Sequence, residues 1–294
     1  SWRATVTPLA SIIGSGFLVA GPVLAHAAGQ LAGLAMTALC ALAYLFGAAI
    51  RSNIRHVEPL MANSPPRSLV GLERASEIAL AFAYFISVAY YLNLFASFAL
   101  RADGIIDAGM TRILSSAVIF ILGVVGATRG LRGLEYVELA AVGLKLALIG
   151  GIVAALAYWS AAALQAGTFA LPEIAHARGT HELRIFLGLL MLVQGFETSR
   201  YLSDSYDRQM RIRTMRRAQL LSMAIYVAFI TLLTPLISDG LPAVGGETAI
   251  IDMLRPLGFI VAPFIIITAL ASQLSAAVAD MNGASGLLAA ASKA

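Results

Sequence analysis

The sequence predicts an all-α polytopic membrane protein in which residues 1–294 form a single transmembrane domain. Hydrophobic residues make up 59% of its 294 residues and charged residues only 12%, whereas soluble domains carry about 25% charged residues. The hydrophobic residues also form long continuous runs rather than short alternating segments. This pattern excludes an outer-membrane barrel and indicates membrane-spanning helices.

About eight spans are expected, because a helix needs about 20 mostly apolar residues to cross a bilayer. Pro65 and Pro66 predict the turn between the second and third spans. Most Lys and Arg residues between spans fall on the inner side if the N-terminus is cytoplasmic. The sequence thus predicts a multi-pass protein of the cell (inner or plasma) membrane with a cytoplasmic N-terminus. The spans are expected at roughly residues 4–28, 30–50, 72–101, 112–128, 133–160, 183–204, 214–238 and 256–280.

The first span carries an interruption, because Gly14 and Gly16 flank Ser15 in the middle of its apolar run. Glycine is a poor residue for continuing a helix, since it loses the most backbone entropy there. In lipid, a broken helix leaves backbone groups that only protein, water or a ligand can satisfy. We therefore expect a helix break that lines a cavity, where the N-terminus of the second half-helix is able to hold an anion.

The third span places Tyr90 and Tyr91 near mid-depth. One of these tyrosines is expected to face the cavity at the helix break. The alternative is that they belong to the belts of tyrosine that are common at membrane interfaces.

The fifth span contains a buried charge. Lys145 is 13 residues from Arg132 and 14 residues from Trp159, which is about 20 Å along a helix in either direction. A lysine side chain, about 6 Å long, is too short to reach water from there. A charged lysine at the bilayer centre costs about 2.5–3.5 kcal/mol, so Lys145 is expected to face the protein interior. A purely structural pairing with Asp280, Glu138 or a helix end is the alternative to a functional role.

The sixth span carries a second interruption, in the segment from Gln194 to Ser199, where Gln and Glu stand beside Gly195. Such polar residues are costly at this depth unless they face protein or water. Gly195 follows Gly14 by 181 residues, and the first and sixth spans run in opposite directions. Two broken spans at corresponding places of two inverted halves are typical of secondary transporters.

Two motifs resemble those of the amino acid–polyamine–organocation (APC) superfamily. Ile12–Phe17 with Gly21 and Pro22 resembles its first-helix motif, and Gly195-Phe196-Glu197 resembles its sixth-helix motif. The tail of the sixth helix departs from the group: an acidic pair followed by Asn-Pro-x-Arg is replaced here by Ser203-Asp204-Ser205-Tyr206-Asp207-Arg208. This departure indicates an outlying branch.

The resemblance implies the leucine-transporter fold, which consists of two inverted repeats of five helices with broken helices 1 and 6. Residues 4–160 fit the first repeat. Residues 182–294 supply only helices 6–8 of the second repeat, so the 5+5 fold is incomplete in this chain. The missing helices are expected from a further C-terminal segment or from a partner chain.

A substrate site between the two broken helices is implied for an amino acid or a related small amine-containing solute. Backbone N–H groups of Ser15, Gly16 and Phe17 would receive its carboxylate, and carbonyl groups of Ile12, Ile13, Val193 and Gln194 would receive its ammonium. Phe196 is either a lid or a packing residue. Glu197 is either a cap of the second half-helix or a site for the substrate amine or a proton. The expected substrate-binding residues are Ile12, Ile13, Ser15, Gly16, Phe17, Tyr90, Tyr91, Val193, Gln194, Gly195, Phe196 and Glu197.

For Lys145 the resemblance implies an ion-coupling role. In several proton-coupled or uncoupled members, a fifth-helix lysine stands where related transporters bind sodium, and it bridges helix 1 and hydroxyl groups of helix 8. Ser272 and Ser275 are expected to supply these hydroxyl groups here. The expected function is therefore a permease that works by alternating access and is proton-linked or uncoupled, not sodium-coupled. Loss of the Lys145 proton would loosen the bridge and favour inward opening.

Nothing in the sequence indicates an enzyme, because it has no nucleophile elbow, metal-binding pair or phosphate loop. No cofactor, metal or nucleic acid is expected, and the expected partners are the small-molecule substrate and the lipid bilayer. Two alternatives stay open. One is an inorganic cation (potassium-type) carrier on the same fold, with Glu197 and backbone carbonyl groups as ligands. The other is a non-transporting sensor or subunit.

Overall fold

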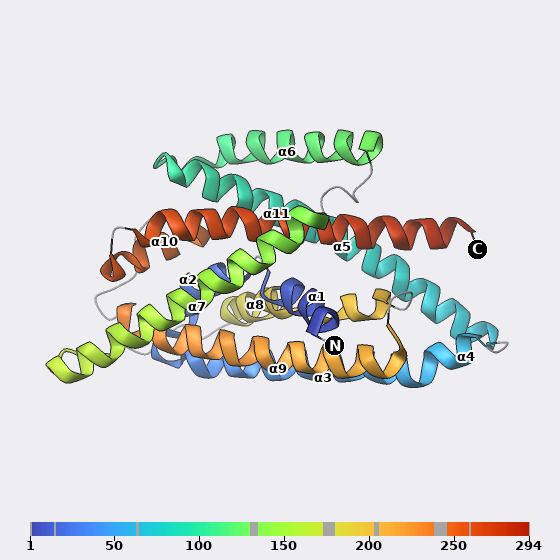
Figure 1. Cartoon of the computed structure of the whole chain (residues 1–294), viewed down its shortest axis with the longest axis horizontal. Coiled ribbons are helices and arrows are strands. Elements are labelled where there is room, and N and C mark those ends of the chain that lie inside the picture. The colour runs from blue at the N-terminus through green and yellow to red at the C-terminus, as the bar shows by residue number, and fades with distance from the viewer. Residues whose placement is uncertain are drawn as a thin grey trace.

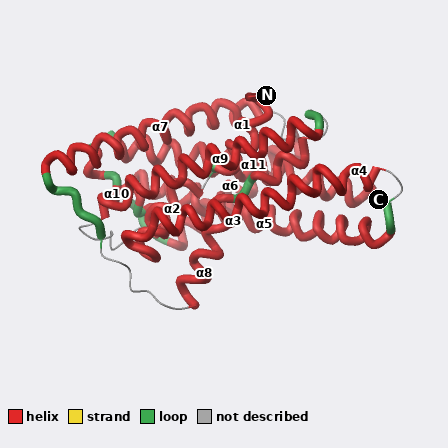
Figure 2. Tube along the Cα trace, turned by 90° about the horizontal axis from the view of Figure 1, so that it is seen from below, coloured by secondary structure: helices red, strands yellow, loops and turns green. Residues whose placement is uncertain are grey.

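The computed structural model describes residues 2–14, 16–62, 65–129, 135–172, 180–202, 206–237, 246–258 and 260–293. Within these ranges all regular structure is helical, with no strands (Figures 1 and 2). The α-helices are α1 (Trp2–Ile12), α2 (Gly16–Ala28), α3 (Ala32–Ser52), α4 (Glu58–Ala62), α5 (Arg67–Ala102), α6 (Ala108–Arg129), α7 (Glu135–Ala166), α8 (Thr180–Leu189), α9 (Arg208–Leu233), α10 (Ile250–Met253) and α11 (Val261–Lys293).

Short tighter or wider helical turns connect several of these helices. A π-helical turn, η2 (Asn53–Val57), continues α3 into α4. The remaining turns are 3₁₀ helices: η1 (Gly29–Leu31), η4 (Leu190–Val193), η5 (Phe196–Leu202), η6 (Thr234–Ile237), η7 (Gly246–Thr248) and η8 (Arg255–Leu257).

Six helical stretches in the described part of the chain are long and apolar enough to cross a membrane. Five of them match predicted spans one to one, and Gly16–Met61 joins the second half of the predicted first span to the second span. The sixth span does not qualify, because it is broken into short pieces. The prediction of an all-α polytopic membrane protein is therefore confirmed. The six stretches are Gly16–Met61, Arg67–Ala102, Ala108–Thr128, Val142–Ala166, Arg208–Ile237 and Val261–Met281.

Local sequence explains where several helices begin. Pro66 is extended, with ψ 144°, and precedes α5, so the two prolines lie between α4 and α5, where the sequence predicts a turn. Asp207 caps α9, because its carboxylate accepts a hydrogen bond from the Met210 N–H at 2.7 Å. Gly29 has φ 52°, and this left-handed residue ends α2 and turns the chain into α3.

Some helices run further than the predicted spans. The helix from α3 continues through η2 to Ala62, and α11 continues to Lys293. Hydropathy locates the apolar part of a helix, whereas its end depends on glycine, proline and caps. The extension of α11 contains no proline. The extension of α3 contains Pro59 in the first turn of α4, where proline is tolerated. Both helices therefore continue past the apolar run.

The helices pack as pairs around the two broken spans. α3 packs along α9, and α5 packs along α11. In Figure 1, α1 and α8 project between these two pairs, and α1 contacts both α9 and the η5 turn. The main hydrophobic core lies at this junction, where the buried Phe17 ring packs against the rings of Tyr226 (centroids 5.4 Å apart) and Phe229 (4.2 Å). The broken segments are thus at the centre of the core.

Large apolar side chains cover the outer faces of α5 and α6. Phe82, Ile86, Ile113 and Phe120 are all more than half exposed. Exposed apolar surface of this kind marks contact with a partner or a membrane. On helices of membrane-spanning length, it is the face expected to contact lipid.

Candidate functional site

The first span is interrupted where the sequence predicts. α1 ends at Ile12 and α2 begins at Gly16. The Gly14 N–H donates to the Ser11 carbonyl at 3.1 Å, which is a single tight turn before the chain leaves the helix. Ser15, one of the expected substrate-binding residues, lies outside the described residues.

The sixth span is also interrupted, and over a longer stretch. α8 ends at Leu189 and passes into η4; Gln194 is extended, and Gly195 has φ 113°. Residues other than glycine rarely adopt this φ, so the break depends on Gly195. The segment after the break is the 3₁₀ helix η5 rather than an α-helix, because Thr198 bonds back three residues to Gly195. Short 3₁₀ segments often mark functional hinges.

The two breaks lie against each other. A Cβ atom on Gly16 would stand 2.4 Å from Cβ of Leu192, and one on Gly195 would stand 2.7 Å from the backbone carbon of Ser11. Both distances are shorter than real Cβ contacts allow. The segments are far apart in sequence, and they cross only because each has a glycine at the crossing point.

Tyr226 of α9 joins the two breaks. Its hydroxyl group lies 3.1 Å from the Ile12 carbonyl oxygen and 2.8 Å from the Leu192 carbonyl oxygen, and it donates to this pair. Both carbonyl groups have lost their partner in a continuous helix, so the tyrosine satisfies groups that the breaks expose. Sequence reasoning missed this residue, because a tyrosine within the apolar run of α9 is indistinguishable from a packing aromatic.

Replacing Tyr226 by phenylalanine is expected to lower the free energy of unfolding by about 1–3 kcal/mol, because two buried carbonyl groups lose their donor. Thermal unfolding of the purified protein measures the change. Tyr158→Phe is the matched control, since the Tyr158 side chain is 79% exposed. Equal unfolding temperatures for the two variants would contradict the bridging role.

Glu197 holds the second break from within. Its carboxylate accepts a hydrogen bond from the Gly195 N–H at 2.9 Å, and the Thr198 hydroxyl donates to the Gly195 carbonyl at 2.7 Å. This geometry agrees with the first of the two expected roles of Glu197, that of a cap. Glu197 as a residue is half-buried, and the role of its carboxylate toward a substrate amine or a proton stays a prediction.

The structure brings together most of the other expected substrate-binding residues. Ile12, Ile13, Gly16 and Phe17 of the first break are buried in the same core as Val193 and Phe196 of the second. Tyr91 is buried elsewhere, against Leu122 of α6 and α11, and Tyr90 lies half-buried between this cluster and the main core. Neither tyrosine lines the cavity that adjoins the second break.

A cavity of about 320 Å³ adjoins the second break. Its walls come from α3, α5 and the break itself, and they are mainly apolar, with polar atoms from Ser87, Gln194 and Glu197. Among the described residues, those of the first break do not line this cavity. Ile12 instead lines a void of about 10 Å³ with Val193 and Tyr226. The larger cavity is lined by Ala43, Phe46, Ile50, Leu80, Ala83, Tyr84, Ser87, Leu190, Gln194, Phe196 and Glu197.

The α5 wall of this cavity was also missed from sequence. Leu80, Ala83, Tyr84 and Ser87 follow the three- and four-residue spacing of one helix face. That spacing is the available signal, and it lies about one to three turns before Tyr90.

Lys145 is buried as expected. Its side chain is 1% exposed on α7, and α7 packs against α11 and α9. Ser272 and Ser275 of α11 are buried as well, and the Ser275 hydroxyl donates to the Ser272 carbonyl at 3.1 Å. Burial in the interior is thus confirmed, while the coupling role of these three residues stays a prediction.

Ion pairs tie the second break to its surroundings. Arg211 of α9 makes a bidentate pair with Glu58 of α4, at 2.9 and 2.6 Å, and also donates to the Arg200 carbonyl of η5 at 3.1 Å. Arg200 itself pairs with Glu73 of α5. At the opposite ends of these helices, Asp252 pairs with Arg101 and lies 3.6 Å from Arg255.

The Arg211–Glu58 pair is expected to stabilise the fold measurably. A double-mutant cycle with Arg211→Gln and Glu58→Gln should give a coupling energy of about 1–3 kcal/mol, because the arginine is only 5% exposed and the pair is bidentate. Arg255→Gln serves as control and should change stability by less than about 0.5 kcal/mol, since Arg255 is 77% exposed. A coupling energy near zero would refute the expectation.

Comparison with known proteins bears on the function of this site. The whole chain, residues 1–294, matches the family model described as APC superfamily transporter. An uncharacterized protein of Aquifex aeolicus (strain VF5) is 39% identical over 291 residues, which cover 98% of this chain and 70% of that protein.

Proposed function

Because the chain belongs to the APC superfamily of transporters, we propose that it moves an amino acid or a related small amine-containing solute across the membrane by alternating access. The observation that carries this proposal is the crossing of two discontinuous helices at Gly16 and Gly195. Breaks in membrane helices leave backbone donors and acceptors free for a ligand, and they allow the half-helices to tilt.

The substrate site is proposed at the second break, with the adjoining cavity of about 320 Å³ as its volume. Glu197, Gln194 and Ser87 supply the polar groups of that cavity, and a carboxylate or carbonyl oxygen there suits an ammonium group. The N–H groups at the start of α2 do not line this cavity, so their contact with the carboxylate of the same ligand is proposed for another position of the half-helices. Pockets of about 300–1,000 Å³ that are mostly apolar with a few polar groups are typical of small-molecule sites.

Transport is proposed to be proton-linked or uncoupled rather than sodium-coupled. The support is Lys145, whose amine is buried on α7 beside the helix that carries Ser272 and Ser275. An ammonium group in this region is proposed to take the structural place of a sodium ion, and its proton is the proposed coupling proton.

Uptake into proteoliposomes tests the proposal. Vesicles containing the purified chain are expected to accumulate label from a uniformly ¹⁴C-labelled mixture of amino acids, and protein-free vesicles are the control. Rubidium-86 uptake without amino acid uptake would favour the inorganic cation carrier instead. Absence of both, with the protein folded and inserted, would favour the non-transporting sensor and refute the proposal.

A further inference from the structure

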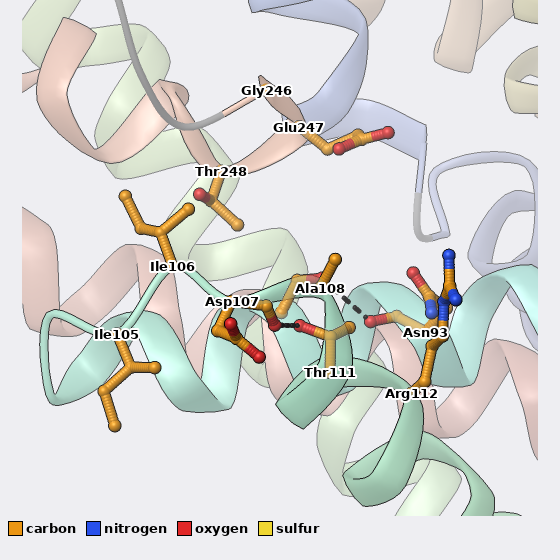
Figure 3. Close-up of a pocket in the computed structure, with 11 residues that line it drawn as sticks. Asn93, Ile105, Ile106, Asp107, Ala108, Thr111, Arg112, Gly246, Glu247 and Thr248 are labelled. Atoms are coloured by element: carbon orange, nitrogen blue, oxygen red, sulfur yellow. Dashed lines mark hydrogen bonds between the residues drawn. The ribbon is translucent and has the colours of Figure 1, made fainter.

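A larger cavity, of about 450 Å³, lies away from the breaks, where the loop between α5 and α6 meets η7 (Figure 3). Its lining comes from three places in the sequence. α5 contributes Asn93 and Ser97, the loop and first turns of α6 contribute residues from Ile105 to Arg112, and η7 contributes Gly246–Thr248. It shares no lining residue with the cavity at the second break.

Charges of opposite sign face each other in this cavity. Figure 3 shows Glu247 on the wall formed by η7, and Arg112 beside Asn93 on the opposite wall. Neither Arg112 nor Glu247 belongs to an ion pair among the described residues, whereas Arg101, Asp252 and Arg255 at the same end of the molecule are paired with one another.

The third charged group of the lining, the Asp107 carboxylate, already accepts a hydrogen bond. Asp107 caps α6, because its carboxylate accepts a hydrogen bond from the Met110 N–H at 2.6 Å. The Thr111 hydroxyl donates to the Asp107 carbonyl at 2.8 Å, as Figure 3 shows. Arg112 and Glu247 are therefore the two charged side chains of the lining that do not already cap a helix.

A second, smaller cavity lies between η7 and the broken helices. Gly246 and Glu247 line this cavity of about 250 Å³, together with Pro22 and His26 of α2 and Ile185 of α8. α2 and α8 are the half-helices that run to the two breaks. The η7 turn thus stands between the large cavity and the half-helices that lead to the proposed substrate site.

We propose that the large cavity is a second binding site, which takes a small zwitterion carrying one carboxylate and one ammonium group. Arg112 receives the carboxylate, since a guanidinium group pairs with it bidentately, and the Asn93 amide adds a donor. Glu247 receives the ammonium group from the opposite wall. The ligand class rests on the proposed function, because it is the class of the proposed cargo, and the site receives the cargo before it reaches the breaks.

Equilibrium dialysis of the purified full chain against the ¹⁴C-labelled amino acid mixture tests this site. Arg112→Gln and Glu247→Gln are each expected to weaken one class of binding site about 10- to 100-fold, because a charge-assisted hydrogen bond is lost. The label retained should then fall by roughly half, since the site at the break persists. Arg255→Gln, at the same end of the molecule, is the control and should retain the wild-type amount.

Two further measurements separate the assignment from general effects of charge. The double variant R112E/E247R restores opposite charges and is expected to regain binding. Unlabelled L-alanine should displace the label, whereas propionate or ethylamine, each with one of the two charges, should not at the same concentration. Wild-type retention by Arg112→Gln, or displacement by propionate alone, would overturn the proposal.

Failure of this site and failure of the proposed function give different results. Uptake by wild-type vesicles with unchanged binding in Arg112→Gln refutes the second site alone. Binding that depends on Arg112 without uptake by any vesicle refutes transport and leaves the site standing. Gel filtration and thermal unfolding of each variant confirm that it is folded before binding is compared.

Discussion

Replacing Gly195 by alanine is expected to abolish transport and to lower the free energy of unfolding by roughly 2–5 kcal/mol. Two effects add. Alanine at φ 113° is strained, and its Cβ atom would stand 2.6 Å from the Ser11 hydroxyl oxygen and 2.8 Å from the Ile12 nitrogen. Backbone atoms on the first break cannot move aside without changing the crossing of the two segments.

Gly188→Ala is the matched control, because Gly188 lies in α8 of the same span and a Cβ atom there meets nothing within 4 Å. This control should be neutral or slightly stabilising, since alanine favours a helix over glycine by about 1 kcal/mol. Uptake of labelled amino acids and thermal unfolding are measured for both variants. A folded Gly195→Ala protein with wild-type uptake would show that the close crossing is not needed for transport.

Replacing Lys145 by alanine is expected to slow transport by roughly 5- to 150-fold, the range of a typical coupling free energy between two states. The uptake rate should also lose its dependence on pH, because the proposed coupling proton resides on the buried amine. Rates measured across a series of pH values in proteoliposomes check both effects.

The control for Lys145 is its neighbour. Leu144→Ala removes side-chain atoms from the exposed face of the same helix, where Leu144 is 45% exposed, and should leave the pH profile as in wild type. A Lys145→Ala protein with wild-type rates and an unchanged profile would reduce this lysine to a structural residue, as in the alternative pairing considered from sequence.

The parts of the structure that could be predicted are those in which a residue type conflicts with its surroundings. Glycines in an apolar run predicted both breaks, and a lysine too far from water predicted its own burial. Each such conflict has a free-energy cost of the order of kcal/mol in lipid, and a break that is satisfied by protein or a buried position removes that cost. The expected inverted repeat and the missing helices remain predictions.

The parts that could not be predicted depend on how helices cross. Tyr226 donates to carbonyl groups that are 34 and 214 positions away in the sequence. Nothing in its own segment distinguishes it from a packing aromatic residue. Tyr84 and Ser87 line a cavity only because α5 passes α3 at the height of the second break. The 3₁₀ form of η5 follows from the hydrogen bond between the Thr198 N–H and the Gly195 carbonyl. Hydropathy gives no information on such bonds.

The hydroxyl group of Tyr226 has a mechanical consequence for the whole molecule. A single atom on α9 anchors both unwound segments, so they cannot slide past each other while the phenol stays in place. We therefore expect the two segments to rotate together about α9 as one rigid unit. Access to either side of the bilayer would then change at the contacts of this unit with its neighbours, such as those of α2 and η5 with α3, and not within it.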